Sequence, residues 1–172
     1  MRVLLAVVAL GLALGCESSA LAQTSLPMGG LSVDPNAPIE FESDALEVSQ
    51  TDDAAVFKGN VLIVQADMRL TAEEVRVSYL RPDDGSEARI SQITATGAVT
   101  LVSGTEQAEA ETAVYDVDAG TIRMSGNVLL TQGPTIVSGE SLLVTLATGT
   151  GVMEGRVRTV INPGNGAGAA RN

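Results

Sequence analysis

The fold is decided by residues 126–155, which read GNVLLTQGPTIVSGESLLVTLATGTGVMEG. Within this stretch Gly126 is followed by Glu140 and then by Gly155, with apolar residues at alternate positions around each of them. The same alternation of an acidic residue with a glycine recurs upstream, so the chain carries an internal repeat of 29 residues. A fixed repeat of this kind indicates one structural unit stacked on copies of itself. The two series are Gly59, Gly97, Gly126 and Gly155, and Asp44, Glu73, Glu111 and Glu140.

The repeat predicts a sheet of eight long antiparallel strands. Apolar residues recur with period two, and turn sequences such as Asp118-Ala119-Gly120 separate the runs. One hairpin is lengthened by the polar segment 81–89. The expected strands are 39–49, 54–64, 69–80, 90–102, 108–117, 121–132, 135–147 and 151–161.

Each expected strand has a glycine or an acidic residue near its middle. A glycine inside a strand marks a bulge or a sharp bend. Eight strands bent in this way behave as about sixteen short ones, and the sheet doubles over into a V-shaped roll. Because the acidic residues recur once per repeat, we interpret them as groups that cap the bends and not as a pair of catalytic carboxylates.

The N-terminus is typical of a secretory signal peptide. Arg2 precedes an apolar run over 3–14, and the small residues Ala20-Leu21-Ala22 offer a cleavage site. Cleavage would leave 150 residues with a net charge of −11. The alternative is lipidation at Cys16, whose preceding residues match a lipoprotein signal poorly. We expect a cleaved signal peptide over 1–22, a flexible leader over 23–37, a β domain over 38–162 and a disordered tail rich in Gly and Ala over 163–172.

The composition excludes several classes of function. The chain has no His, and its single Cys, Cys16, is lost with the signal peptide. Thiol catalysis, His-dependent catalysis and His/Cys metal sites are therefore excluded. Ten scattered basic residues form no footprint for nucleic acid. The segment Asp116–Gly120 places its glycine one position too early for a calcium loop, so it is interpreted as a hairpin turn. No catalytic residue, cofactor or metal is predicted.

The period-two apolar positions predict one inward stripe, almost free of aromatic residues. This stripe has two interpretations: an ordinary core, or a groove too wide for small side chains to fill. A groove could bury acyl chains, at about 0.8 kcal/mol for each CH₂ group. The predicted lining residues are Phe41, Leu46, Val48, Phe57, Val61, Ile63, Val75, Val77, Tyr79, Ile93, Val99, Leu101, Tyr115, Ile122, Met124, Val128, Leu130, Leu142, Val144, Met153 and Val157.

The two outermost strands of such a roll carry unpaired backbone groups, because the sheet does not close. Neither expected edge strand has the lysines or internal prolines that protect an edge. We therefore predict head-to-tail self-association by strand addition, which gives open filaments. The residues expected to take part are Ile39, Phe41, Val152, Val157 and Ile161.

Several phrases resemble the LptA, OstA-like family of periplasmic lipopolysaccharide-transport proteins: Phe57-Lys-Gly-Asn-Val61, Ile93-Thr-Ala-Thr-Gly-Ala-Val99, Ala113-Val-Tyr-Asp-Val117 and Gly126-Asn-Val-Leu-Leu-Thr-Gln132. The resemblance covers about 39–162. It implies an antiparallel β-jellyroll that binds the acyl chains of lipopolysaccharide in its groove and projects the sugars outward. It also implies three kinds of protein partner: further copies, stacked head to tail, an inner-membrane-anchored jellyroll relative and an outer-membrane β-barrel assembly protein.

Lipopolysaccharide is anionic and the chain is acidic, so burial of acyl chains has to drive binding, with Lys58, Arg69 or Arg76 as candidate phosphate contacts. Three other functions stay open. An exported structural or adhesive repeat protein would have a filled core and bind no lipid. A carbohydrate-active enzyme would need two of the repeated acids to converge in a cleft. A membrane-anchored relative in the same pathway would keep an uncleaved N-terminal helix.

Overall fold

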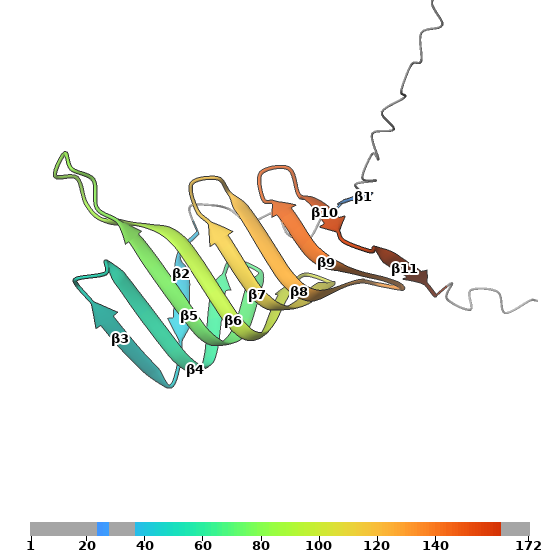
Figure 1. Ribbon diagram of the computed structural model, residues 1–172, viewed down its shortest axis with the longest axis horizontal. Coiled ribbons are helices and arrows are strands. Elements are labelled where there is room, and N and C mark those ends of the chain that lie inside the picture. The colour runs from blue at the N-terminus through green and yellow to red at the C-terminus, as the bar shows by residue number, and fades with distance from the viewer. Residues whose placement is uncertain (1–23, 28–36, 163–172) are drawn as a thin grey trace, which may run out of the picture.

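The computed structural model describes residues 24–27 and 37–162, which form strands and turns of one bent antiparallel sheet (Figure 1). The predicted all-β antiparallel fold is confirmed. All eight expected strands are present, and the first and the last are each split in two. The strands are β1 (Thr24–Pro27), β2 (Ile39–Glu42), β3 (Ala45–Ser49), β4 (Ala54–Gln65), β5 (Met68–Leu80), β6 (Arg89–Ser103), β7 (Glu106–Asp116), β8 (Thr121–Gln132), β9 (Thr135–Thr145), β10 (Thr150–Glu154) and β11 (Arg158–Ile161).

The strands bend at the glycines of the repeat, as predicted. The registers of β4, β6 and β8 with their neighbours shift at Gly59, Gly97 and Gly126, and Gly155 lies in the break between β10 and β11. Each glycine and the residue after it have positive φ, for example 85° at Gly126 and 50° at Asn127. Two successive left-handed residues insert a bulge and turn the strand, and glycine adopts that conformation without steric cost.

The acidic residues of the repeat cover these glycines from the neighbouring strand. A Cβ atom on Gly126 would lie 2.7 Å from Cβ of Glu111, and the equivalent atom on Gly97 would lie 2.5 Å from Oε2 of Glu73. The amide Nδ2 of Asn127 donates to Oε1 of Glu111 at 2.6 Å. The acidic side chains are exposed, and each lies over the next glycine of the repeat, on the neighbouring strand. This geometry supports a structural role for the series.

Two of the four repeats have no asparagine after the glycine, since Ala98 and Arg156 take its place, and the first of these positions gives a prediction. Ala98 has a φ of 45° at the position that asparagine occupies in two other repeats. We expect Ala98→Asn to stabilise the fold by about 1 kcal/mol, because asparagine tolerates the left-handed region and its amide can donate to Glu73. Urea unfolding midpoints test this, with Ala98→Gly separating relief of backbone strain from the new hydrogen bond. A midpoint for Ala98→Asn no higher than that of Ala98→Gly would contradict a stabilising bond.

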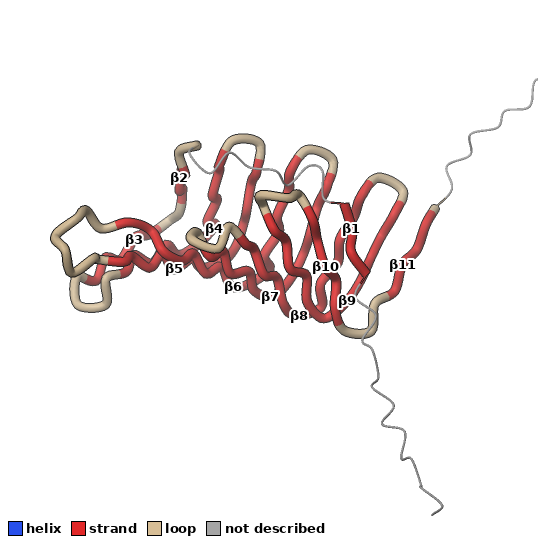
Figure 2. Tube along the Cα trace, turned by 90° about the horizontal axis from the view of Figure 1, so that it is seen from above, coloured by secondary structure: helices blue, strands red, loops and turns tan. Residues whose placement is uncertain are grey.

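The line of bends divides the sheet into two limbs (Figure 2). Limb 1 contains β1, β3, β10 and the segments 54–58, 74–80, 89–96, 112–116, 121–125 and 141–145 of the long strands. Limb 2 contains β2, β11 and the segments 61–65, 68–72, 99–103, 106–110, 128–132 and 135–139. Every strand pairing in the described chain lies within one limb. The limbs meet through one cluster of apolar side chains.

The edges of the sheet differ from the prediction at the C-terminal end. Thr24–Pro27, expected within a flexible leader, form β1 and pair with β10. Val152 is therefore opposite Ser25 and does not lie in an edge strand. Pairing of this kind uses backbone groups alone, so it leaves no side-chain pattern in the sequence. The expected signal peptide and tail lie outside the described residues.

The remaining residues expected at the edges do lie in or beside outer strands. Ile39 and Phe41 are in β2, the last strand of limb 2 at its β4 end. Ile161 is in β11, which pairs with β9 at the opposite end. Val157 lies between β10 and β11 and is partly buried against the core.

Candidate functional site: the trough between the limbs

The inner faces of both limbs are apolar. Of the predicted lining residues, Phe41, Phe57 and Val157 are partly buried and pack against the core. The buried ones are Val61, Ile63, Val75, Val77, Ile93, Val99, Leu101, Tyr115, Ile122, Met124, Val128, Leu130, Leu142, Val144 and Met153. The period-two pattern therefore identified the inner side of each strand on both sides of the bend.

Three predicted lining residues are not in the buried interior. Leu46 and Val48 are 55% and 71% exposed, and Tyr79 is 37% exposed. Leu46 and Val48 pair with Phe57 and Ala55, so they share the inner face. They stay exposed because β3 is the outermost strand of limb 1 and no further strand covers it. Tyr79 lies at a register irregularity close to the end of β5, beyond the buried part of limb 1.

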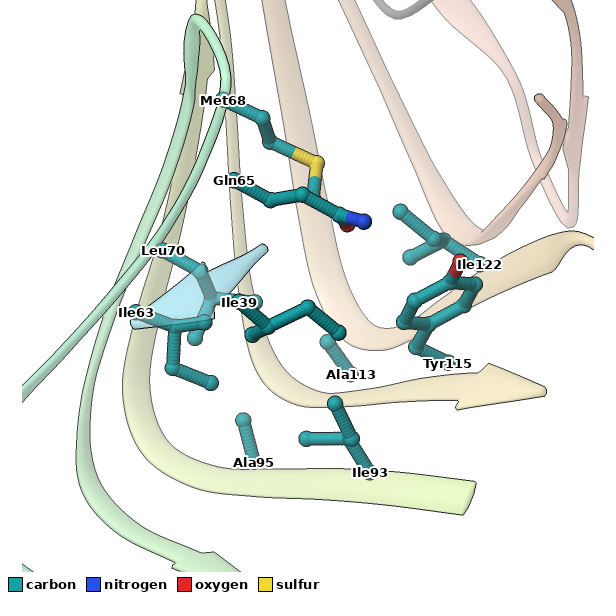
Figure 3. A pocket seen from close by; sticks show the side chains of 10 residues that line it. All are labelled: Ile39, Ile63, Gln65, Met68, Leu70, Ile93, Ala95, Ala113, Tyr115 and Ile122. Atoms are coloured by element: carbon teal, nitrogen blue, oxygen red, sulfur yellow. The ribbon is translucent and has the colours of Figure 1, made fainter. Parts of the chain in front are cut away.

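A cavity of about 20 Å³ lies between the limbs (Figure 3). Ile63 and Leu70 line it from limb 2, and Ile93 and Tyr115 line it from limb 1. Several of its lining residues were missing from the sequence prediction, although they continue the same period-two stripe. These are Ile39, which was assigned to the edge alone, the polar Gln65, and Met68, Leu70, Ala95 and Ala113.

The volume of this cavity shows that the limbs pack closely around it. About 20 Å³ accommodates one water-sized sphere and no acyl chain. The interpretation as an ordinary core therefore describes this closed state, and an acyl chain can enter only if the limbs separate. Because the strand pairings run within each limb, separation breaks apolar contacts and leaves the backbone ladders intact. Lipid chains would replace those apolar contacts.

An aromatic pair bridges the limbs at the β2 end of the trough. The rings of Phe41, from limb 2, and Phe57, from limb 1, are stacked with centroids 4.7 Å apart and an interplanar angle of 12°. Such a pair stabilises the contact by about 0.5–1.5 kcal/mol beyond the area it buries. It holds the limbs together at this end.

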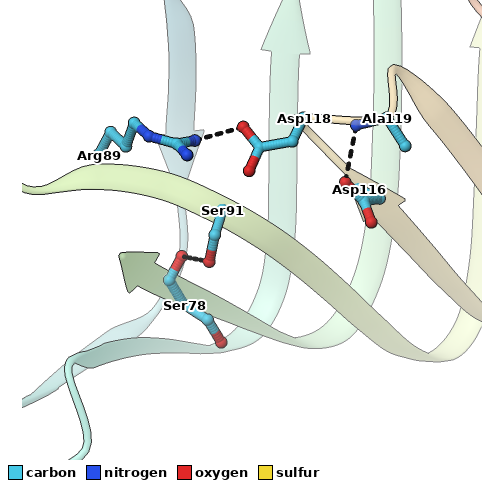
Figure 4. A network of polar contacts seen from close by, with 6 residues as sticks. All are labelled: Ser78, Arg89, Ser91, Asp116, Asp118 and Ala119. Atoms are coloured by element: carbon cyan, nitrogen blue, oxygen red, sulfur yellow. Dashed lines mark hydrogen bonds and ion pairs between the residues drawn. The ribbon is translucent and has the colours of Figure 1, made fainter. Parts of the chain in front are cut away.

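The rim of limb 1 is joined by polar contacts between successive hairpins (Figure 4). Arg89, at the start of β6, forms an ion pair with Asp118, in the turn after β7. The side chain of Asp116 accepts a hydrogen bond from the backbone N–H of Ala119 at 2.9 Å. The hydroxyl of Ser91 donates to the carbonyl of Ser78 at 3.1 Å. Exposed ion pairs contribute little singly, but these contacts tie neighbouring turns into one unit.

The candidate phosphate contacts lie on the outer face. Nζ of Lys58 is 2.8 Å from Oε2 of Glu47, and this hydrogen bond is the main cause that raises the pKa of Lys58. Arg69 and Arg76 are exposed and alternate with buried neighbours, so they point away from the trough. None of the side chains that line the cavity is a cation.

The described part of the chain holds neither a cluster of metal-ligating side chains nor a membrane-spanning helix. Between residues 37 and 162, no three or more His, Cys, Asp or Glu side chains converge on a position for a metal ion. Within the same described part, no helix has the length and apolar character needed to cross a membrane. The uncleaved helix of an anchored relative would fall in 1–22, outside the described residues.

Comparison with known proteins identifies the family. Residues 40–150 match the family model described as LptA/(LptD N-terminal domain) LPS transport protein. An uncharacterized protein of Rhizobium meliloti (strain 1021) is 36% identical over 168 residues, which is 92% of this chain and 89% of that protein. The crystal structure of LptH from Pseudomonas aeruginosa superposes with a TM-score of 0.64 at 19% identity, covering 76% of this chain and 99% of that one. This structural match supports the predicted jellyroll fold. The chain belongs to the LptA/LptD N-terminal domain family of lipopolysaccharide-transport proteins.

Proposed function

We propose that this protein is a periplasmic carrier of lipopolysaccharide that bridges the inner and outer membranes. Its trough shields the acyl chains and passes them to the outer-membrane assembly complex. The observation that carries the proposal is a continuous apolar inner face on two limbs that share no strand pairing. The signal-peptide pattern and the description of LptH as the LptA-homologous periplasmic component of a lipopolysaccharide transport device support the location.

The energies allow an acidic protein to bind an anionic lipid. Burying an acyl chain of twelve carbons contributes about 9 kcal/mol relative to water, at about 0.8 kcal/mol per CH₂. Two like charges about 10 Å apart in water repel by only about 0.4 kcal/mol, and physiological salt reduces this further. Acyl burial therefore exceeds the electrostatic opposition, provided that the limbs can separate.

Assembly into a bridge would use the two ends of the sheet. At one end β2 and β3 are outermost, with Leu46 and Val48 exposed. At the other end β11 is outermost in limb 2, while β1 pairs with β10 and is outermost in limb 1. A further copy, the anchored relative or the outer-membrane protein would extend the sheet by strand addition. At the limb 1 end it would add to β1 or displace it.

The alternative function is that of an exported structural or adhesive repeat protein without a lipid ligand. The nearly filled interior is the observation in its favour, because a core of that kind needs no ligand. The proposal includes no enzymatic activity. The repeated acids lie over their own bends, on the exposed side, and do not line the cavity.

Photocrosslinking separates the two functions. Benzoylphenylalanine should replace Phe57 or Tyr115, which are aromatic and line the trough, with Arg76 and Arg123 as controls on the outer face. Val77 and Val128 also face inward but are 0% and 1% exposed, so the bulky probe would overpack the core there. We expect adducts with purified lipopolysaccharide at the two inner positions alone. Equal labelling at the controls, or none anywhere, would contradict the carrier function.

A further inference from the structure

The rim of limb 2 differs from the rest of the inner face because its last inward row is polar. In the sheet, Ser103 is opposite Glu106, and Glu106 is opposite Gln132. Gln65 and Ser103 are both opposite Met68, so the row continues across five strands. These polar residues continue the alternation of the buried apolar positions of their strands, and they therefore face inward.

Two members of this row are polar groups placed where water is largely excluded. Gln65 is 2% exposed, lines the cavity and donates through Nε2 to the carbonyl of Ala37 at 3.2 Å. Oε1 of Glu106 accepts from Nε2 of Gln132 at 2.9 Å. Oε2 of Glu106 is buried and has no donor among the described residues. A buried acceptor without a donor is costly, and such groups in proteins usually have a specific reason.

Limb 1 presents one polar group to the same cavity. The Tyr115 ring lines the cavity with its hydroxyl directed along the space between the limbs (Figure 3). Burial raises the pKa of the Tyr115 phenol above its ordinary value, and the phenol hydroxyl can donate or accept a hydrogen bond. The cavity and the polar row thus combine acceptors and neutral donors with no positive charge. Hydroxyl and amide groups suit such a rim, and a phosphate does not.

We propose that this polar row is the contact that recognises the sugar end of the lipid. Glu106 Oε2 accepts a hydrogen bond from a hydroxyl or amide N–H of an acylated amino sugar, while the acyl chains lie deeper between the limbs. The phosphates stay in solvent, away from the limb 2 rim. This inference rests on the proposed carrier function and adds a determinant of specificity to it.

The test compares two carboxylates on β7. Glu106→Gln replaces the unpaired acceptor on the inner face, and Glu109→Gln removes the same charge from an exposed outer position three residues along. Affinity is measured for purified lipopolysaccharide and for dodecanoic acid, which has an acyl chain and no sugar. We expect Glu106→Gln to weaken lipopolysaccharide binding about tenfold, with dodecanoic acid binding unchanged. Glu109→Gln should resemble the unaltered protein with both ligands.

The thermal unfolding midpoint of the free protein separates recognition from a structural role. We expect Glu106→Gln to keep or raise this midpoint, because it removes a buried carboxylate oxygen that lacks a donor. A lowered midpoint together with equal losses for both ligands would assign Glu106 to the fold and overturn the proposal. Unchanged lipopolysaccharide affinity in Glu106→Gln would also overturn it and leave the carrier function standing. Failure of the unaltered protein to bind lipopolysaccharide would overturn both.

Discussion

Gly126→Ala should destabilise the protein by about 3 kcal/mol. The φ of 85° costs a residue with a Cβ about 1–2 kcal/mol. The new Cβ would also lie 2.7 Å from Cβ of Glu111, an atom near the backbone that cannot swing aside. Relieving this overlap means shifting one strand against the next, at a cost of roughly 1–3 kcal/mol. The urea unfolding midpoint measures the total.

Gly85→Ala is the matched control for this substitution. Gly85 has a φ of 80°, but no atom lies within 4 Å of the position its Cβ would take. We expect Gly85→Ala to lower the free energy of unfolding by about 1 kcal/mol, from backbone strain alone. The difference between the two variants measures the close contact at the bend. Equal losses would show that the Cβ added at Gly126 is accommodated beside Glu111 without a steric cost.

Leu130→Ala should cost a similar amount, about 3 kcal/mol, for a different reason. The Leu130 side chain is 0% exposed on the inner face of β8, and its truncation loses burial and leaves a void. The cost depends on how tightly the opposite limb packs on it. Chemical unfolding of the free protein, without lipid, gives the value.

The neighbouring leucine provides the control. Leu129 is on the outer face of the same strand and is only partly buried, so Leu129→Ala should cost less than about 1 kcal/mol. Similar losses for the two variants would mean that the closed trough is loosely packed or hydrated. A large difference would support limbs that pack as a core until a ligand separates them.

The local features of the fold could be read from the amino-acid order. The positions of Gly59, Gly97 and Gly126 predicted where the strands bend, because the left-handed conformation is a property of the single residue. The side-chain alternation identified Val77 and Leu130 as inward-facing, since period two follows from strand geometry. The resemblance that pointed to lipopolysaccharide transport rests on the same repeated phrases, and the family match confirms it.

Only the tertiary structure decided which edges are covered and how wide the trough is. The pairing of β1 with β10 is made by backbone groups at an edge of the sheet that no other strand occupies. A pattern of side chains records neither the backbone groups nor the free edge. The cavity of about 20 Å³ depends on how two limbs approach each other. The polar row of Gln65, Ser103, Glu106 and Gln132 joins residues from four strands, and their alignment follows from register. The conformation of each strand follows from its own residues. The edges of the sheet, the width of the trough and the polar row at the rim of limb 2 depend on segments that are distant in the sequence and meet in space.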